Sequence, residues 1–371
     1  MPTAVIIGAG IGGLTAGIAL GRRGWTVTVY ERAPELRPVG SGLAIAANAL
    51  KALDVLDLGD RVRELSRVQG MAALRTARGR YLSHIPEERI SARYGDSVVL
   101  LKRAALQDLL VNALPPGVLH LGTEARLMDA DRGLVEASGE TLEADLVVAA
   151  DGIGSPARAA LFPSHPEPVY AGFTAWRALV SAPGRFEATE TWGEGSAFGV
   201  MPMADDTVYL YATATVPLGT IYPDDRAELL RRFAHWHTPI PHLLSLLDPA
   251  HVIRNDVHHL TPPLPTVHRG RTVLLGDAAH PMTPNLGQGA CQAIEDALVL
   301  AHIPDPATYT ATRLPRTTKI ASRSASVARA VSLTSPWATT LRDTAMRLTS
   351  CLPMGLFLRS LDDPLGWTPP Q

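Results

Sequence analysis

The chain has 371 residues, of which 46% are hydrophobic and 19% charged, and a formal net charge of −2. This length supports a large core in two or three closely associated domains. The near-neutral charge gives no reason to expect a nucleic acid or an anionic membrane as partner. The two cysteines, Cys291 and Cys351, form neither a C-x-x-C pair nor a metal-ligand cluster, which favours a reducing cytosol. We therefore expect a cytoplasmic protein without a metal site.

The N-terminal segment carries a dinucleotide-binding pattern. Residues 4–7 are an apolar strand, and residues 8–13 read Gly-Ala-Gly-Ile-Gly-Gly. A helix to about residue 23 and a second strand over 26–30 follow, and the strand ends at Glu31. Although residues 4–21 carry no charge, their six glycines argue against a membrane-spanning helix or a signal peptide. Strand, glycine turn, helix, strand and acid together predict nucleotide binding.

Each glycine of this turn has its own expected role. Gly8 permits the tight turn, Gly10 lets a pyrophosphate approach the backbone, and Gly13 lets helix and strand pack closely. Glu31 is placed to accept hydrogen bonds from ribose hydroxyls, and its charge argues against a 2′-phosphate in this site. A G-x-G-x-x-G match alone is weak evidence, since glycine-rich turns produce it by chance. The flanking elements make nucleotide binding the better interpretation.

A second informative stretch covers residues 272–296. A buried strand over 272–275 ends at Gly276-Asp277, and a loop with two prolines leads to a helix that begins at Gly287 to Gly289. The start of a helix gathers free N–H groups and partial positive charge, which suit an anion. Asp277 can accept hydrogen bonds from a polyol. His280 precedes a proline, and we favour a loop-ordering role for it over a catalytic one.

The segments between these two motifs predict further elements of the first domain. Residues 36–45 form a glycine-rich loop, either on the surface or as a backbone wall against a flat ring, and a helix follows over about 48–56. A strand over 98–101 leads to a helix over 103–114, where Arg103 faces either solvent or a phosphate. Segments 118–121, 125–129 and 133–137 form a small meander, and a buried strand over 145–150 ends at Asp151-Gly152.

The predicted secondary structure changes at residue 170. Longer strands are predicted over 170–180, 189–203, 207–217 and 251–260, with an amphipathic helix over 224–236. They indicate a mixed or antiparallel sheet inserted into the first domain. Residues 306–331 and 336–361 are expected to be helical, with a kink at Pro315 and a Pro-rich tail from 362. The predicted division is 1–165 and 266–305 for the nucleotide-binding domain, 166–265 for the sheet domain, and 306–371 for the C-terminal helical region.

Three separated motifs resemble one family. They are the N-terminal fingerprint with Glu31-Arg32, the segment Val-Val-Ala-Ala-Asp-Gly over 147–152, and Gly276-Asp277 with its continuation. Together they resemble the single-component FAD-dependent aromatic hydroxylases, the p-hydroxybenzoate and salicylate hydroxylase superfamily, and are similar to zeaxanthin epoxidase and tetracycline-degrading monooxygenases. Segments 170–177 and 309–316 are also similar, so the likeness runs from residue 3 to about 330. Ala47 departs from the pattern, because relatives often have proline there.

The resemblance implies an α/β fold. A Rossmann-like FAD-binding domain has a parallel sheet and a β-meander, and it is joined by an inserted mixed-sheet substrate domain and C-terminal helices. It also implies FAD as cofactor, with NAD(P)H as transient reductant and O2 as co-substrate. The implied cofactor-binding residues are Gly8, Gly10, Ile11, Gly12, Gly13, Glu31, Arg32, Gly42, Leu43, Ala44, Arg103, Ala125, Asp151, Gly152, Asp277, Pro284, Gly287, Gln288, Gly289 and Ala290.

By the same resemblance the chain is an FAD-dependent monooxygenase. A flavin C4a-hydroperoxide would hydroxylate or epoxidise an aromatic, heteroaromatic or polyene small molecule, so no catalytic side chain is required beyond the flavin. Candidates for the substrate pocket are Phe198, Met201, Tyr209, Tyr211, Pro284 and Asn285. For each of them the sequence favours a place in the core over one in the pocket, because a sheet has two faces and the sequence does not set its register. A monomer and a homodimer both remain open.

Three alternative functions are compatible with parts of the sequence. A flavin-dependent halogenase shares the fold but would need a W-x-W-x-I-P stretch, and none of the six tryptophans lies in one. An FAD-bound sensing or stabilising protein would bind flavin without turnover. An NAD-dependent dehydrogenase would use the N-terminal fingerprint but leave residues 272–296 unexplained. The monooxygenase accounts for more of the chain than any of these.

Overall fold

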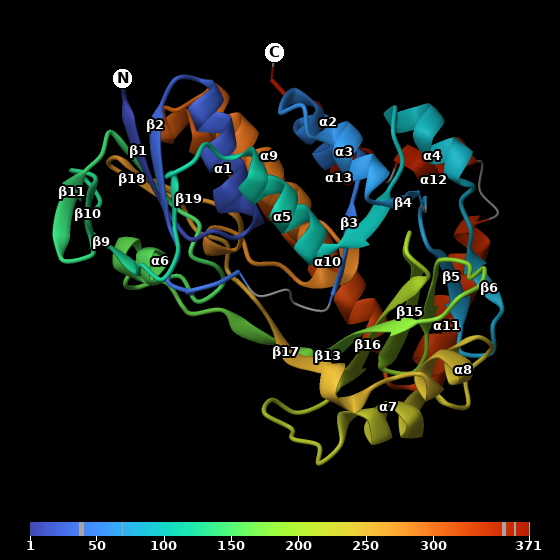
Figure 1. Cartoon of the computed structure of the whole chain (residues 1–371). Helices are drawn as coiled ribbons and strands as arrows, with labels where there is room; N and C mark the ends of the chain where they lie inside the picture. Colours follow the sequence, from blue (N-terminus) through green and yellow to red (C-terminus); the bar gives the residue numbers. More distant parts are fainter. Residues whose placement is uncertain (37–40, 69, 351–353, 360, 371) are drawn as a thin grey trace.

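The computed structural model describes residues 1–36, 41–68, 70–350, 354–359 and 361–370. Cys351 and part of the glycine-rich segment over 36–45 lie outside them. In the described residues, two sheet regions lie side by side, and the helix α10 (Pro306–Val331) extends from one to the other (Figure 1).

The first region is built on a six-stranded sheet with the order β18-β19-β12-β1-β2-β8. Its strands are β1 (Thr3–Ile7), β2 (Thr26–Tyr30), β8 (Leu119–His120), β12 (Leu146–Ala149), β18 (His268–Arg269) and β19 (Thr272–Leu274). All pair in parallel except β18, which is antiparallel to β19. The central strands β1 and β12 are almost wholly buried, as expected for apolar runs with both faces covered.

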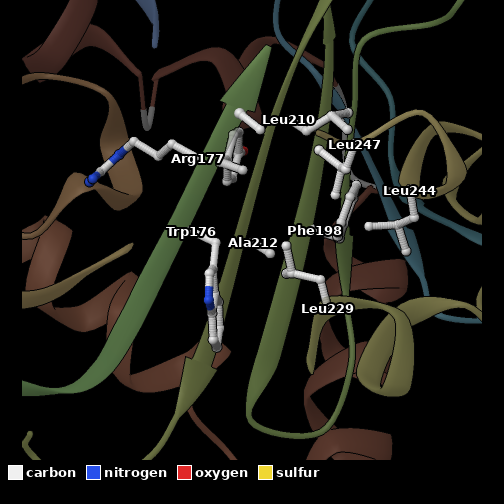
Figure 2. Close-up of a pocket in the computed structure, with 10 residues that line it drawn as sticks. Trp176, Arg177, Phe198, Leu210, Ala212, Leu229, Leu244 and Leu247 are labelled. Atoms are coloured by element: carbon white, nitrogen blue, oxygen red, sulfur yellow. The ribbon is translucent and has the colours of Figure 1, made fainter. Parts of the chain in front are cut away.

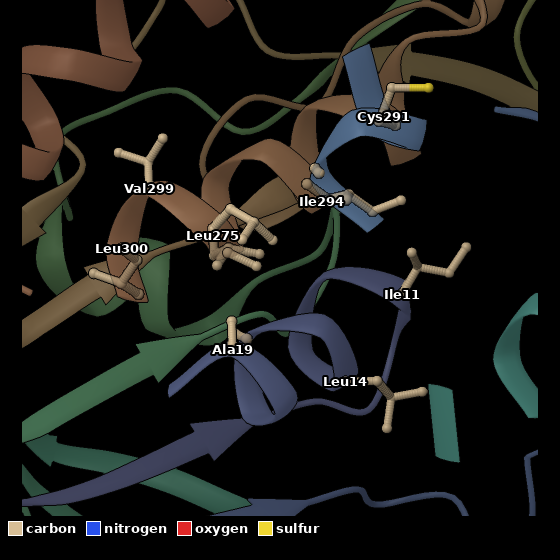
Figure 3. Packing of buried hydrophobic residues seen from close by; sticks show 14 of the residues in the cluster. Ile11, Leu14, Ala19, Leu275, Cys291, Ile294, Val299 and Leu300 are labelled. Atoms are coloured by element: carbon tan, nitrogen blue, oxygen red, sulfur yellow. The ribbon is translucent and has the colours of Figure 1, made fainter. Parts of the chain in front are cut away.

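The two faces of this sheet have different covers. Ala4 and Ile6 of β1 belong to the main core with the helices α1 (Ile11–Arg22), α5 (Arg103–Ala113) and α9 (Gly289–His302). Figure 3 shows side chains of α1 and α9 meeting beside Leu275. Val5 and Ile7 point to the other face, into a small cluster with the strands β9 (Ala125–Asp129) and β10 (Leu134–Ala137).

The predicted meander is present but differs in its membership. It consists of β9, β10 and β11 (Glu140–Glu143). Placing residues 118–121 in the meander was wrong, because β8 pairs in parallel with β2 in the main sheet. Strand β11 escaped prediction since it is polar and mostly exposed, and therefore lacks apolar alternation.

A third, small sheet has the order β3-β7-β4, with β3 (Gly42–Ile45), β4 (Arg67–Val68) and β7 (Val99–Lys102). The interpretation of residues 42–45 as a loop was therefore wrong. They pair antiparallel with β7, from Gly42 opposite Lys102 to Ile45 opposite Val99. Around this sheet lie α2 (Ala47–Val55), α3 (Gly59–Glu64) and α4 (Glu87–Tyr94).

The second region is a seven-stranded mixed sheet with the order β17-β13-β16-β15-β14-β5-β6. Its strands are β5 (Ala73–Thr76), β6 (Tyr81–Ser83), β13 (Val169–Ser181), β14 (Thr189–Trp192), β15 (Ser196–Pro202), β16 (Thr207–Thr215) and β17 (Ile253–His259). Only the β14–β5 pair is parallel among its described pairings. Two of its strands thus come from residues 73–83, before the segment 166–265 in which the sequence placed this sheet.

The sequence suggested one strand over residues 189–203, but the structure has two strands there, β14 and β15. The segment Trp-Gly-Glu-Gly-Ser turns the chain into a hairpin between β14 and β15. Gly195 adopts φ +60°, and the N–H of Gly193 donates to the carbonyl of Ser196 at 2.8 Å. Glycine is the residue that takes this left-handed conformation without strain.

The remaining elements close the molecule around these sheets. They are α6 (Pro156–Leu161), α7 (Asp225–Phe233), α8 (Ile240–Ser245), α11 (Pro336–Ser350), α12 (Met354–Arg359), α13 (Asp362–Leu365) and the 3-10 turns η1 (Pro249–His251), η2 (Gly276–Ala278) and η3 (Pro284–Leu286). Helix α10 continues through Pro315 for 26 residues. Among the described residues, we find no helix long and apolar enough to span a bilayer. The predicted fold class is confirmed.

Candidate active site

The predicted nucleotide-binding residues meet at one edge of the parallel sheet. Gly8 follows β1, Glu31 follows β2, Asp151 follows β12 and Asp277 follows β19. Because the carboxyl ends of parallel strands share an edge, these four segments lie together although they are far apart in the sequence. This edge of an open α/β sheet is where ligands bind in such folds.

The turn after β1 has the shape that its glycines predicted. Gly8 has φ +104°, and a Cβ there would lie 2.4 Å from the carbonyl oxygen of Ala150. A Cβ at Gly13 would lie 2.0 Å from the carbonyl oxygen of Gly8. A Cβ at Gly12 would meet Leu275 at 2.6 Å. Gly10 differs, because nothing lies within 4 Å of a Cβ built there. Three glycines are needed for packing, and Gly10 borders open space.

The acid after β2 is held by backbone donors. The Glu31 carboxylate accepts from the N–H of Ala9 and from the N–H of Ala33, each at 2.9 Å. An ionised carboxylate has about four acceptor sites, so two remain for hydroxyl donors. Asp151 shows a similar surplus, because its Oδ2 accepts from Ala157 at 3.1 Å while its buried Oδ1 has no partner.

Basic residues flank this edge. Arg103 lies exposed at the start of α5, and Arg32 lies exposed just beyond Glu31. Ala125, the first residue of β9, is partly buried and packs against the small cluster with Tyr30. Ile11 is buried in the main core, so it can offer only its backbone N–H at the free start of α1.

The stretch after β19 forms the other wall. Gly276 adopts φ +61° and Gly287 φ +62°, which turn the chain into η2 and into the start of α9. Asp277 is exposed, and a Cβ at Gly289 would lie 3.9 Å from its carboxylate. Gln288, at the N-cap of α9, makes no capping hydrogen bond with its side chain. The first N–H groups of α9 thus face the same space as Asp277.

Two further predicted residues lie differently from the others in this stretch. Gln288 is 2% exposed, and its Oε1 accepts from Asn48 and from Gln292, each at 3.1 Å. Its side chain is committed to the interior. Gly287 lies opposite Ala44 of β3, and a Cβ added at Gly287 would lie 3.9 Å from the Ala44 side chain. This brings residues 42–44 next to residues 284–290, as a wall formed by a strand.

A buried ion network fixes this loop from behind. Asp296 accepts from the backbone of Gly276 at 3.0 Å and from His280 Nε2 at 2.6 Å. Arg313 of α10 donates to Asp296 at 2.6 Å and to Glu295 at 2.6 Å. Burial alone would raise the pKa of Asp296, but His280 and Arg313 hold it below its usual range. His280 therefore orders the loop, in agreement with the role the sequence favoured.

The seven-stranded sheet turns two chemically different faces to its surroundings. Trp176, Ala178, Phe198, Val200 and Leu210 belong to a buried core against α7 and α8. The opposite face carries Arg177, Leu179, Glu190, Met201 and Tyr211, which are all partly exposed although they lie inside the molecule. This second face keeps exposed surface and packs in part against Leu100 and Ala44 of the small sheet, and we call it the open face.

The register separates the predicted pocket residues. Met201, Tyr209 and Tyr211 lie on the open face, in a cluster with Leu100 and with Ala44 of β3. Phe198 does not, so its assignment to the pocket was wrong. It is 1% exposed, and its ring lies 5.2 Å from that of Phe233. Figure 2 shows Phe198 among leucines of the buried core, with the Arg177 side chain pointing away from Trp176.

Glycines admit the two tyrosine rings. A Cβ at Gly42 would lie 2.5 Å from the Tyr209 ring, and one at Gly199 would lie 2.1 Å from the Tyr211 ring. Asn285 lines a small pocket with Phe173, Thr213, Ala328 and Val331, between the open face and α10. Pro284 precedes it and is exposed. The open face, β3 and the loop over 284–288 thus converge on one space.

Comparisons with known proteins agree with this geometry. Residues 1–303 match the model of a family described as FAD binding domain. The chain is 43% identical over 307 residues to the aurachin C monooxygenase/isomerase of Stigmatella aurantiaca, covering 81% of this chain and 79% of that protein. It is 34% identical over 368 residues to the 2-heptyl-3-hydroxy-4(1H)-quinolone synthase of Pseudomonas aeruginosa, covering 93% and 94%.

The chain belongs to the FAD-dependent monooxygenases. A solved structure of HpxO from Klebsiella pneumoniae with FAD and uric acid superposes with a TM-score of 0.88 at 28% identity, covering 98% of this chain and 96% of that one. The predicted family, cofactor and class of enzyme are confirmed.

The residues at the sheet edge fit the FAD of this monooxygenase family. The open space at Gly10 suits a pyrophosphate. The unpartnered Oδ1 of Asp151 and the remaining acceptor sites of Glu31 suit hydroxyl groups. Asp277 would hold the ribityl chain, and the start of α9 would face the negative charge of the reduced ring. These individual contacts remain predictions.

Sequence reasoning missed two groups of this monooxygenase. Glu190 went unnoticed, because only the strand pairing shows that it faces Tyr211 across β15. The network around Arg313 was also missed. A signal existed for it, since the acids Glu295-Asp296 lie in the middle of the largely apolar helix α9, and buried carboxylates need partners.

One prediction follows for Glu31. Glu31→Ala removes a charged acceptor, and charge-assisted hydrogen bonds contribute about 1.5–3 kcal/mol. The Kd for FAD, measured by fluorescence quenching on reconstitution, should rise about 10- to 150-fold. Glu140→Ala, at an exposed carboxylate of β11, is the control and should leave this Kd unchanged. Equal Kd values for both variants would remove Glu31 from the FAD site.

Proposed function

We propose that this FAD-dependent monooxygenase hydroxylates a heteroaromatic small molecule with O2, using NAD(P)H as transient reductant. The observation that carries the proposal is the convergence of β3, the loop over 284–288 and the open face of the seven-stranded sheet on one space. The FAD contacts predicted at the sheet edge would direct the isoalloxazine ring toward this space.

The chain's own residues then have three tasks. Glu31, Asp277 and the start of α9 hold the cofactor. Met201, Tyr209 and Leu179 supply an apolar and aromatic surface against which a flat ring can lie. Closing this surface against β3 keeps water away from the reacting atoms. When bound and reduced, FAD supplies the oxygen chemistry, so these residues need only bind and orient the substrate.

The relatives support a heteroaromatic ring. The name of the Pseudomonas aeruginosa relative contains a quinolone, and the HpxO structure contains uric acid. Both compounds are nitrogen heterocycles, and both belong to those relatives. Epoxidation of a polyene finds no such support, and hydroxylation is therefore the better candidate.

The test is substrate-dependent oxygen transfer. We expect NAD(P)H oxidation by the FAD-loaded enzyme to accelerate at least about tenfold with one member of a panel of quinolones, pyridones and purines. Under 18O2, that compound should gain one labelled oxygen atom by mass spectrometry. Flavin that binds but supports neither acceleration nor label with any compound would favour the sensing or stabilising alternative.

A further inference from the structure

Glu190 is the acid of the open face, and its neighbours Met201, Tyr209 and Tyr211 on this face are apolar or aromatic. It lies in β14, opposite Gly199 of β15, which in turn lies opposite Tyr211 of β16. Because Gly199 has no side chain, Tyr211 reaches across it, and the Tyr211 hydroxyl donates to Glu190 Oε2. The indole N–H of Trp192 donates to Glu190 Oε1 at 2.5 Å. The carboxylate is thus fixed by a donor at each oxygen.

This row occupies the centre of the open face. On one side of it lie Met201 and Tyr209, which pack against Ala44 of β3. On the other side lies the pocket of Thr213 and Asn285. Glu190 therefore stands between the wall expected to hold the flavin ring and the wall formed by α10. A substrate that lies on this face in the proposed function would be close to Glu190.

Glu190 has no cationic partner in the part of the chain that the structure describes. Burial raises its pKa, and the hydrogen bonds from Tyr211 and Trp192 act in the opposite direction. Arg177 is on the same face, but two strands separate it from β14. The Arg177 guanidinium donates to Asn255 at 3.2 Å. An ionised carboxylate has about four acceptor sites, so about two remain beyond these donors. Glu190 also keeps some exposed surface on the open face.

We propose that Glu190, oriented by Tyr211 and Trp192, is a specificity-determining residue that accepts a hydrogen bond from an uncharged N–H or O–H heteroaromatic substrate and rejects rings that carry a carboxylate. This inference rests on the proposed function and names its substrate class. The uncharged ring is bound because its N–H or O–H can donate to a free lone pair of the Glu190 carboxylate. The ring with a carboxylate is rejected because like charges repel strongly where water is scarce. A site for an anionic ring would instead place an arginine or lysine beside this position, whereas two strands lie between β14 and the strand of Arg177.

The test uses the FAD-loaded enzyme and a matched pair of compounds, 4-quinolone and 4-quinolone-2-carboxylate. Their Kd values are measured from changes in the flavin absorption spectrum, without turnover. The wild-type enzyme should bind the uncharged compound at least about tenfold more tightly. In Glu190→Gln the carboxylate should bind more tightly and the uncharged compound more weakly. The Kd of the carboxylate divided by the Kd of the uncharged compound, called the ratio below, should therefore fall at least about tenfold.

Two variants control this experiment. Glu194→Gln makes the same change at an exposed acid of the same hairpin and should leave the ratio unchanged. Tyr211→Phe keeps the ring beside Gly199 but removes the donor to Glu190, and should lower the ratio partly. Flavin content reports whether each variant is folded.

Three results would overturn the inference. They are an unchanged ratio in Glu190→Gln, tighter binding of the carboxylate by the wild-type enzyme, and binding of neither compound. The proposed function fails separately, because it requires label from 18O2 in a product. If oxygen is transferred but the ratio does not change in Glu190→Gln, the proposed monooxygenase function holds and Glu190 does not determine specificity.

Discussion

Arg313→Leu should lower the free energy of unfolding by about 3–5 kcal/mol, the usual cost of removing one partner from a buried ion pair. Arg313 is 2% exposed and holds Asp296 and Glu295, neither of which has exposed surface. Its Nη2 also donates to Gln292 Oε1 at 2.8 Å. Leucine fills part of the volume but leaves Asp296 with an unmatched oxygen. Urea unfolding of FAD-free protein measures the effect without ligand stabilisation.

The control for Arg313→Leu lies on the same helix. Lys319 pairs with Asp363 at 2.9 Å, but its side chain is 62% exposed. Exposed ion pairs contribute about 0–1 kcal/mol, so Lys319→Ala should have little effect. If both variants unfold at similar urea concentrations, the network around Asp296 does not stabilise the fold as described.

Gly10→Ala should weaken FAD binding at least about tenfold, or 1.4 kcal/mol, while the FAD-free protein stays as stable as the wild type. Alanine fits the protein itself, because the backbone at Gly10 is extended and nothing lies within 4 Å of the added Cβ. In the dinucleotide fold this glycine lets the pyrophosphate approach the backbone. The added methyl group would then occupy space that the cofactor needs. Reconstitution with FAD and urea unfolding measure the two quantities.

Gly21→Ala is the matched control. Gly21 lies in helix α1, for which Gly10 is the N-cap, and it is exposed and also has nothing within 4 Å of a Cβ. Replacing a helical glycine by alanine stabilises by about 0.5–1 kcal/mol, and FAD affinity should not change. Wild-type affinity in Gly10→Ala would mean that the pyrophosphate does not pass this turn.

Local sequence predicted the nucleotide-binding half well. Turn and strand-end residues such as Gly8, Glu31 and Asp277 carry their meaning in short-range patterns, and parallel strands bring their carboxyl ends together without further information. The same holds for Gly13, whose lack of a side chain is required by one short contact to Gly8. Fold class and cofactor could be predicted for this reason.

The substrate side could not be predicted in the same way. Whether Phe198 or Met201 faces the opening depends on strand register, and shifting a strand by one residue reverses every side chain. The hairpin at Gly193 and Gly195 set that register and was not expected. The environment of Glu190 depends on Tyr211, which reaches it from β16 across the intervening strand β15. Pairings between distant segments decide this face.

The most direct test of the central claim is the visible absorption spectrum of the purified protein after incubation with FAD and removal of the unbound cofactor. We expect a yellow protein with the two absorption bands of oxidised flavin. Heat should release about one FAD per chain, because one nucleotide-binding fold provides one site. A colourless protein that takes up no FAD would contradict the assignment of this chain as an FAD-dependent monooxygenase.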